Sequence, residues 1–289
     1  MLSSNDVLVL NNTKVIPARF YVETKAGKKV ELLLVSSQGP DPLTWKVLAK
    51  PRKYIDKTHE LKLPINPNII IKVLDSETIE FSSHEDLNMI LTNVGQMPLP
   101  PYIKREVEEI DIDRYQTVFG NVPGAVAAPT SALHFTPELL EEISKKGVEI
   151  LYITLHVGPG TFLPIRTNNI NEHKLIPESF YIEPEVWHKI LLAKRDKKRI
   201  IACGTTTLRA LEYAARVDKL SGLNTLYITP GFEFYVVDGL ITNFHLPKTT
   251  LLVLVSAFIG WENIKKIYSE AIGKKYRFYS YGDATFLTN

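Results

Sequence analysis

Residues 199–209, with the sequence RIIACGTTTLR, decide the fold class because they join a buried strand to a helix. Arg199–Cys203 is short and apolar, and Gly204 with three threonines leads into a segment whose apolar residues recur at helical spacing. Strand and helix alternate on both sides of this segment. Strands are indicated at 148–157, 227–228 and 235–241, and helices are indicated after Thr136, from Pro184 and at 261–272. This alternation predicts an α/β sheet whose faces are covered by helices.

Residues 19–83 have a different pattern. Short β-branched or aromatic segments at 30–35, 43–48, 69–74 and 78–81 are separated by Gly, Pro, Asn and Asp. This spacing is typical of an antiparallel meander and predicts a small β-barrel or sandwich.

Composition limits the class of protein. The 289 residues are 45% hydrophobic and 23% charged, which excludes a disordered, collagen-like or coiled-coil chain. The net charge of +2 gives no global attraction for a polyanion, so a nucleic acid would need a local patch. The single cysteine, Cys203, excludes an intramolecular disulfide and a clustered-cysteine metal site, and no HExxH motif is present.

Neither a membrane span nor a signal sequence is indicated. The longest apolar run, 251–259, is too short for a bilayer, and the first residues lack a basic region followed by an apolar one. We expect a cytoplasmic protein. The apolar strand at 7–10 begins so early that we also expect the chain to be a shortened form.

Two glycine- and threonine-rich segments follow predicted strands, where ligands of α/β sheets bind. In 155–162, Gly158 and Gly160 permit close backbone approach beside His156 and Thr161, although this segment taken alone favours a tight turn with a core histidine. In 204–209, the helix start could bind an anion, or the threonines could only cap the helix. Neither a Walker A loop nor GxGxxG occurs.

Two further segments offer polar groups. In 241–247, Asn243 and His245 lie just beyond a strand, and the histidine is either a turn cap or a general base. In 277–284, hydrogen-bonding aromatic residues surround Asp283, as packing alone would also produce. Three basic clusters, of which 50–53 is the first, are either solvated faces or RNA contacts.

These segments resemble the S-adenosylmethionine:tRNA ribosyltransferase-isomerase family of queuosine biosynthesis. They occur in the same order as in that family and extend over nearly the whole chain. The resemblance is specific because about a dozen separate blocks are collinear. Among them are VLNNTKVIPAR (9–19), GQMPLPPYI (95–103), GAVAAPT (124–130), TLHVG (154–158), GTTT (204–207), TNFHLP (242–247) and YSYGDA (279–284).

The resemblance implies an α/β main domain, here 1–18 with 93–289, and an inserted antiparallel β-barrel domain at 19–92. It implies a cytoplasmic enzyme that consumes S-adenosylmethionine as a substrate, with no metal and no bound cofactor. The ribosyl moiety is transferred to 7-aminomethyl-7-deazaguanine in a tRNA anticodon and isomerised to epoxyqueuosine, and adenine and methionine leave. We expect a monomer that does not bind membranes.

The sulfonium acidifies the adjacent ribose C5′ protons, so a positioned base can remove one of them. A base whose pKa lies near the operating pH suits this step, which favours histidine. We predict His156, then His245, as the base, with Asp283 as an orienting group or second base. Thr205, Thr206 and Arg209 suit the methionine carboxylate. The other predicted substrate-binding residues are Asn12, Arg19, His134, Gly158, Gly160, Thr161 and Asn243, and the predicted tRNA-binding residues are Lys50, Arg52 and Lys53.

Several positions depart from the family pattern. The chain has eight residues before the first block, and Ile176 stands where the family usually has a second histidine. These departures leave one alternative open, a shortened, non-catalytic paralogue that binds RNA or a nucleoside. Without the resemblance, the sequence also fits a generic α/β enzyme acting on a nucleotide or sugar.

Overall fold

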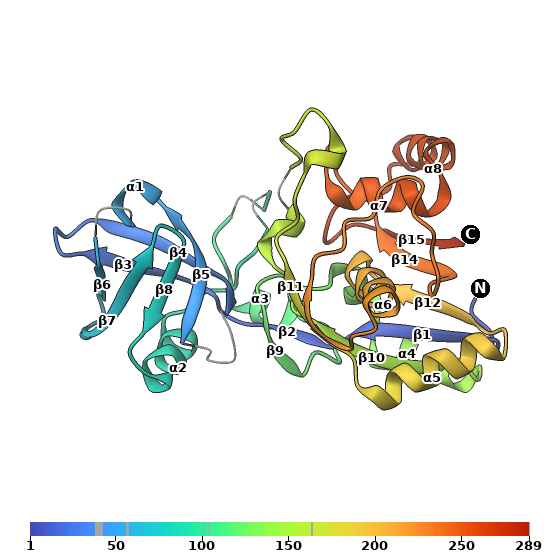
Figure 1. The fold of residues 1–289 in the computed structure, drawn as a ribbon, viewed down its shortest axis with the longest axis horizontal. Coiled ribbons are helices and arrows are strands. Elements are labelled where there is room, and N and C mark those ends of the chain that lie inside the picture. The colour runs from blue at the N-terminus through green and yellow to red at the C-terminus, as the bar shows by residue number, and fades with distance from the viewer. Residues whose placement is uncertain (38–42, 56–57, 101, 104, 163, 289) are drawn as a thin grey trace. The chain divides into compact units, whose positions relative to one another are not determined.

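The computed structural model divides the chain into two compact units (Figure 1). Met1–Lys14 and Gln116–Asn289 form the α/β unit, and Val15–Tyr115 forms the barrel unit. The barrel unit extends beyond residue 92, the end predicted for the inserted domain. The structure describes residues 1–37, 43–55, 58–100, 102–103, 105–162 and 164–288.

A seven-stranded sheet forms the centre of the α/β unit, in the order β13-β11-β10-β1-β12-β14-β15. The strands β10, β1, β12 and β14 are parallel, whereas β11, β13 and β15 pair antiparallel at the two edges. The central strand β1 is buried along its whole length, as is typical of a parallel strand covered on both faces. The strands are β1 (Asp6–Asn11), β10 (Glu149–Leu155), β11 (Glu178–Tyr181), β12 (Arg199–Cys203), β13 (Ser221–Asn224), β14 (Gly239–Asn243) and β15 (Ala284–Thr288).

The side chains of β1 alternate between two cores, as the two-residue period of a strand requires. Val7 and Val9 belong to one core with residues of α5, α6 and α7, and Leu8 and Leu10 belong to another core with Ile143 of α4. The helix α4 begins as predicted, because the Thr136 hydroxyl accepts the Leu139 N–H. The helices are α4 (Pro137–Lys145), α5 (Pro184–Arg195), α6 (Thr205–Val217), α7 (Thr250–Ile259) and α8 (Trp261–Gly273).

The barrel unit contains a closed antiparallel barrel in the order β3-β4-β5-β8-β7-β6. Its strands alternate buried and accessible residues, so each contributes one face to the barrel interior, where the Phe20 and Phe81 rings lie 6.3 Å apart. The elements are β3 (Arg19–Thr24), β4 (Lys29–Ser37), β5 (Thr44–Lys50), α1 (Arg52–Ile55), β6 (Glu60–Leu63), β7 (Asn66–Asp75), β8 (Thr78–Phe81), α2 (His84–Asn93) and α3 (Glu109–Arg114).

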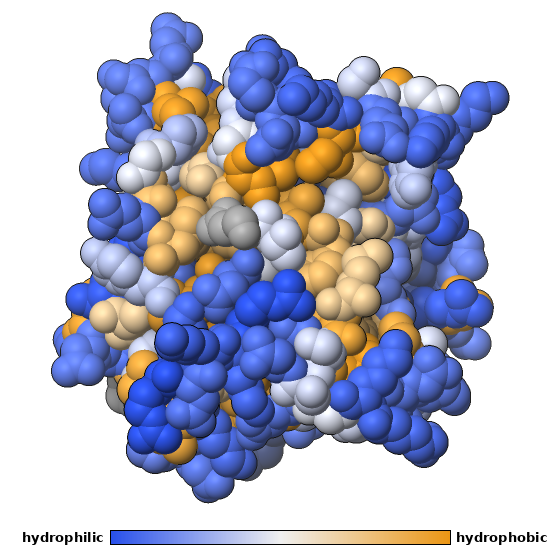
Figure 2. Space-filling view, turned by 90° about the vertical axis from the view of Figure 1, so that its right-hand side faces the viewer, coloured by the Kyte–Doolittle hydropathy of each residue, from blue (hydrophilic) through white to orange (hydrophobic). Residues whose placement is uncertain are grey.

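The predicted fold class, an α/β domain with a small antiparallel barrel, is confirmed. The strand predicted at 227–228 is wrong, because these residues form a loop, and the strand predicted from Tyr235 begins only at Gly239. Within the described ranges no helix is long and apolar enough to cross a membrane. Figure 2 shows a face on which hydrophilic side chains surround a smaller apolar area.

Candidate active site

Four predicted segments meet at one edge of the sheet. Because β1, β10, β12 and β14 are parallel, the residues that follow them all lie at the carboxyl edge, where α/β sheets bind ligands. These residues are Asn12, His156 to Gly158, Gly204 with Thr205, and His245. The topology therefore brings the loops around Gly158, Thr205 and His245 to the same edge.

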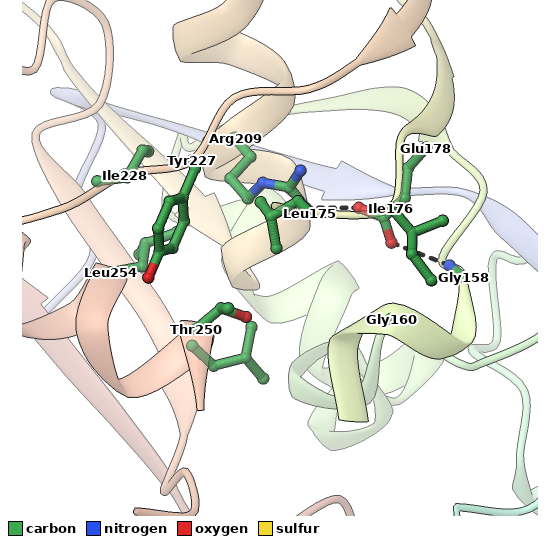
Figure 3. Close-up of a pocket in the computed structure, with 11 residues that line it drawn as sticks. Gly158, Gly160, Leu175, Ile176, Glu178, Arg209, Tyr227, Ile228, Thr250 and Leu254 are labelled. Carbon is green, nitrogen blue, oxygen red and sulfur yellow. Dashed lines mark hydrogen bonds and ion pairs between the residues drawn. The ribbon is translucent and has the colours of Figure 1, made fainter. Parts of the chain in front are cut away.

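A pocket at this edge contains predicted residues from two of these loops (Figure 3). Its enclosed volume is about 20 Å³, enough for one water molecule. A larger ligand therefore requires a lining side chain to move. The lining residues are Gly158, Gly160, Leu175, Ile176, Glu178, Arg209, Tyr227, Ile228, Thr250, Leu251 and Leu254.

A buried ion pair joins three elements around this pocket. Arg209 Nη1 donates to Glu178 Oε2 at 2.5 Å, and Glu178 Oε1 accepts the Gly158 N–H at 2.9 Å (Figure 3). Arg209 Nε donates to the Leu226 carbonyl at 2.9 Å. The side chains of Arg209 and Glu178 are 8% and 4% exposed, so their interaction is little screened by solvent. The pair fixes the first turns of α6 against the start of β11 and the loop after β10.

Two buried donors of the pocket lining have no partner among the described residues: Arg209 Nη2 and the Tyr227 hydroxyl. Burial raises the pKa of Tyr227, so its phenol keeps its proton at neutral pH. An unsatisfied buried donor costs about 1–3 kcal/mol. An acceptor that reached both groups, such as a carboxylate, would remove this cost.

His156 is held in a defined orientation two residues before the pocket glycine. Its Nδ1 lies 2.8 Å from Thr13 Oγ1, and its ring packs on Gly124, where an added Cβ would lie 2.7 Å from His156 Cε1. Burial lowers the pKa of His156 below its ordinary value. The imidazole is therefore neutral at pH 7 and able to accept a proton.

A second polar cluster surrounds Asn243 at the end of β14. Asn243 Oδ1 accepts from Thr130 at 3.2 Å and Ser131 at 3.0 Å, both in the short helix η1 (Thr130–His134). Asn243 Nδ2 lies 3.3 Å from His134 Nε2. The structure thus brings the predicted residues Asn243 and His134 together, although neither lines the pocket.

The first turn of α6 lies close to this cluster. The helix has no side-chain N-cap, and an added Cβ at Gly204 would lie 3.6 Å from Thr206 Oγ1 and 3.9 Å from Ser131 Oγ. Thr205 and Thr206 are each 5% exposed. Their hydroxyls are therefore within the protein rather than on its surface.

His245 and Asp283 make other contacts. His245 Nε2 lies 3.0 Å from Thr242 Oγ1, and the His245 N–H donates to the Tyr268 hydroxyl at 2.8 Å. Burial lowers the pKa of His245 to about 4. Asp283 accepts from the Arg277 side chain at 3.0 Å, which lowers the pKa of that carboxyl. Asp283 is thus paired with an arginine and remains a carboxylate.

The remaining predicted residues lie elsewhere. Asn12 Oδ1 accepts from Thr154 at 2.7 Å at the end of β1. Arg19 is on β3 of the barrel unit, where Nη2 donates to the Leu99 carbonyl. The backbone of Thr161 is in the short helix η2 (Pro159–Phe162), but its side chain is outside the described residues.

The predicted tRNA-binding residues Lys50, Arg52 and Lys53 are on β5 and α1 of the barrel unit. Arg52 is exposed but pairs with Glu77 at 3.1 Å, which compensates part of the positive charge of this cluster.

Three polar residues of the pocket were not predicted from the sequence: Glu178, Tyr227 and Thr250. One signal was available for Glu178, because the alternation along β11 places it on the same buried side as Phe180. In the part of the chain that the structure describes, no group of three or more His, Cys, Asp or Glu residues could hold a metal ion.

A family model described as queuosine biosynthesis protein matches residues 1–287. Proteins named S-adenosylmethionine:tRNA ribosyltransferase-isomerase are similar over most of their length. The one from Citrifermentans bemidjiense is 44% identical over 98% of this chain and 84% of its own. The one from Sulfurihydrogenibium sp. is 46% identical over 99% of this chain and 85% of its own.

A solved structure is also similar. The crystal structure of an S-adenosylmethionine tRNA ribosyltransferase from Thermotoga maritima matches with a TM-score of 0.51 and 32% identity. The match covers 99% of this chain and 83% of that one.

Proposed function

The chain belongs to the queuosine biosynthesis protein family, and from this we infer that it is an S-adenosylmethionine:tRNA ribosyltransferase-isomerase. The observation that carries this conclusion is identity of about 44% over nearly the whole chain to enzymes of that name. No comparison supports the non-catalytic alternative.

The reaction transfers the ribosyl moiety of S-adenosylmethionine to the aminomethyl nitrogen of 7-aminomethyl-7-deazaguanine in tRNA. The base removes a C5′ proton next to the sulfonium, the amine nitrogen forms the new C–N bond, and adenine and methionine leave. S-adenosylmethionine is consumed, so our proposal requires no bound cofactor. We place the reaction in the cytoplasm, where tRNA is found.

His156 is our proposed base. Its neutral imidazole, held by Thr13 and Gly124, can take a proton without first losing one. His245 is the second candidate, although its lower pKa makes it a weaker base. Asp283 would then act on the reaction through its charge, since it is paired with Arg277.

Arg209 is our proposed site for the methionine carboxylate. Its Nη1 and Nε atoms are bound by the protein, which fixes the guanidinium and leaves Nη2 for a substrate acceptor. The Tyr227 hydroxyl would donate to the same carboxylate. Ile176 contacts the Gly160 position, so movement of the Ile176 side chain would enlarge the pocket.

Adenine release tests the function. The purified chain should release adenine from S-adenosylmethionine with tRNA that carries 7-aminomethyl-7-deazaguanine, and not with tRNA that carries guanine there. His156→Ala should abolish the release while S-adenosylmethionine still binds. No release by the wild-type chain would contradict the function, and full release by His156→Ala would remove only the assignment of the base.

A further inference from the structure

A groove of about 570 Å³ lies beside the candidate active site within the α/β unit. Helix α7 separates the two. Thr250 and Leu254 line the active-site pocket, whereas Leu252, Val253 and Ser256 line the groove. At 100° per residue these two sets lie on opposite sides of the helix. A ligand in the groove would therefore be about one helix diameter from the reacting groups.

The groove carries positive charge that the protein does not neutralise. Arg166 and Lys248 both line it, and neither forms an ion pair with any residue that the structure describes. No carboxylate is among its lining residues. By contrast, Lys265 of α8 pairs with Glu262 at 2.7 Å, and Lys274, the residue after α8, pairs with Glu270 at 2.6 Å.

The two cationic residues are held in place by their backbones. The Ile165 N–H donates to the Lys248 carbonyl at 2.8 Å, and Pro164 and Thr249 form an antiparallel bridge. The segments that carry Arg166 and Lys248 are therefore joined side by side, so the two side chains start from neighbouring backbone positions at the groove.

An exposed aromatic side chain completes the groove. Trp261, the first residue of α8, lines it and is 53% exposed. Thr167 Oγ1 also lines it, and this atom is shielded from solvent without a hydrogen-bond partner in the described structure. A flat aromatic face, two cations and a free hydroxyl suit a nucleotide, because its base stacks and its phosphates bind cations.

We propose that this groove binds an unpaired nucleotide of the tRNA that neighbours the modified one. Trp261 stacks on the base, and Arg166 and Lys248 bind the flanking phosphates. This inference rests on the proposed function, which requires that an anticodon nucleotide reach the adjacent pocket. It adds a contact in the α/β unit to the predicted one at Lys50, Arg52 and Lys53 in the barrel unit.

Three variants of the full chain test the groove: Trp261→Ala, Trp261→Phe and the pair Arg166→Ala/Lys248→Ala. Lys274→Ala is the matched control, because Lys274 is an exposed lysine directly after α8 that pairs with Glu270. The measurements are the dissociation constant for precursor tRNA at several salt concentrations without S-adenosylmethionine, the dissociation constant for S-adenosylmethionine, and the thermal unfolding midpoint.

Trp261→Ala should weaken tRNA binding about tenfold, whereas Trp261→Phe should retain most of the affinity because a stacking ring remains. The charge variant should reduce the salt dependence of binding by about one to two counterions. Lys274→Ala, the unfolding midpoints and S-adenosylmethionine affinity should not change.

Two results would overturn the inference and leave the proposed function intact, provided the wild-type chain releases adenine. The first is tRNA affinity and salt dependence within about twofold of wild type in all groove variants. The second is a parallel loss of S-adenosylmethionine affinity, which would mean that the changes act through α7 on the pocket. Failure of the wild-type chain to release adenine would overturn both, and it is measured separately.

Discussion

Replacing either member of the buried Arg209–Glu178 pair alone should strongly destabilise the α/β unit. Replacing both members should cost less unfolding free energy than the sum of the two single replacements. In Arg209→Met the Glu178 carboxylate loses the guanidinium and keeps the Gly158 N–H, and in Glu178→Met the Arg209 guanidinium loses the carboxylate and keeps the Leu226 carbonyl. Both side chains are under one-tenth exposed, so each single change leaves a buried charge without its counter-ion. Each should cost about 3–5 kcal/mol of unfolding free energy.

The double variant removes both charges of the pair, and the Gly158 N–H and the Leu226 carbonyl lose the partners that the pair gave them. Two such groups cost about 2–6 kcal/mol together. The double variant should therefore be about 3 kcal/mol more stable than the sum of the single changes implies. If our assignment of Arg209 is right, the double variant should also fold but bind S-adenosylmethionine poorly.

Urea unfolding provides the measurement. The chain has three tryptophans, and in a Trp45→Phe/Trp261→Phe background only Trp187 on α5 remains. Trp187 packs against the sheet core, so its fluorescence reports the α/β unit alone. Additivity of the two single changes within about 0.5 kcal/mol would refute the reasoning, because it would show that the two groups do not interact.

Three further changes give definite expectations. Between pH 6.5 and 4 the free energy of unfolding should fall by up to about 3 kcal/mol as pH decreases. Burial lowers the pKa of His245 to about 4, so the unfolded chain binds the proton first. His245→Gln should flatten this dependence in urea titrations. Gly124→Ala should lower the rate of adenine release at least about tenfold, because its Cβ would lie under 3 Å from the His156 ring at a φ of +147°; an unchanged rate would dissociate the orientation of His156 from catalysis. Glu212→Gln should destabilise the chain by about 3 kcal/mol in the same unfolding assay. The Glu212 carboxylate accepts the N–H groups of residues 235–237 and pairs with Arg216. A fall in unfolding free energy below about 0.5 kcal/mol would show that this loop is held by other contacts.

The fold could be predicted where local sequence and tertiary packing agree. The apolar run of β1 and the Thr136 cap of α4 each define an element without reference to distant residues. The strand β13 could not be predicted in this way. Its sequence, Ser-Gly-Leu-Asn, has no β-branched residue, and it is a strand because it pairs with β11.

At 227–228 the sequence predicts a strand where the structure has a loop, and the cause is related. The segment is apolar and aromatic, but at Leu226, the residue before it, both backbone groups are bound by side chains instead of a neighbouring strand. The Leu226 carbonyl accepts from Arg209, and the Leu226 N–H donates to Asn224 Oδ1. Such partners satisfy the backbone as well as a sheet would, and single-sequence patterns do not reveal them.

The candidate site was predictable to the same extent. Gly158, Gly160 and Arg209 stand out because their local settings, glycines after a strand and an arginine in the first turns of a helix, have chemical meaning on their own. Glu178, Tyr227 and Thr250 acquire meaning only from the fold, which brings them to the same pocket from three separate elements.

The point at which the chain leaves and re-enters the α/β unit makes that unit separable by design. The Asn12 carbonyl, just before the exit after Lys14, accepts the N–H groups of Asn121 at 3.0 Å and Val122 at 3.2 Å, soon after the return at Gln116. The segment before the barrel and the segment after it are thus hydrogen-bonded to each other within the α/β unit. A short glycine-rich linker between residues 14 and 116 would test whether the α/β unit folds, and recognises the sulfonium nucleoside, without the barrel.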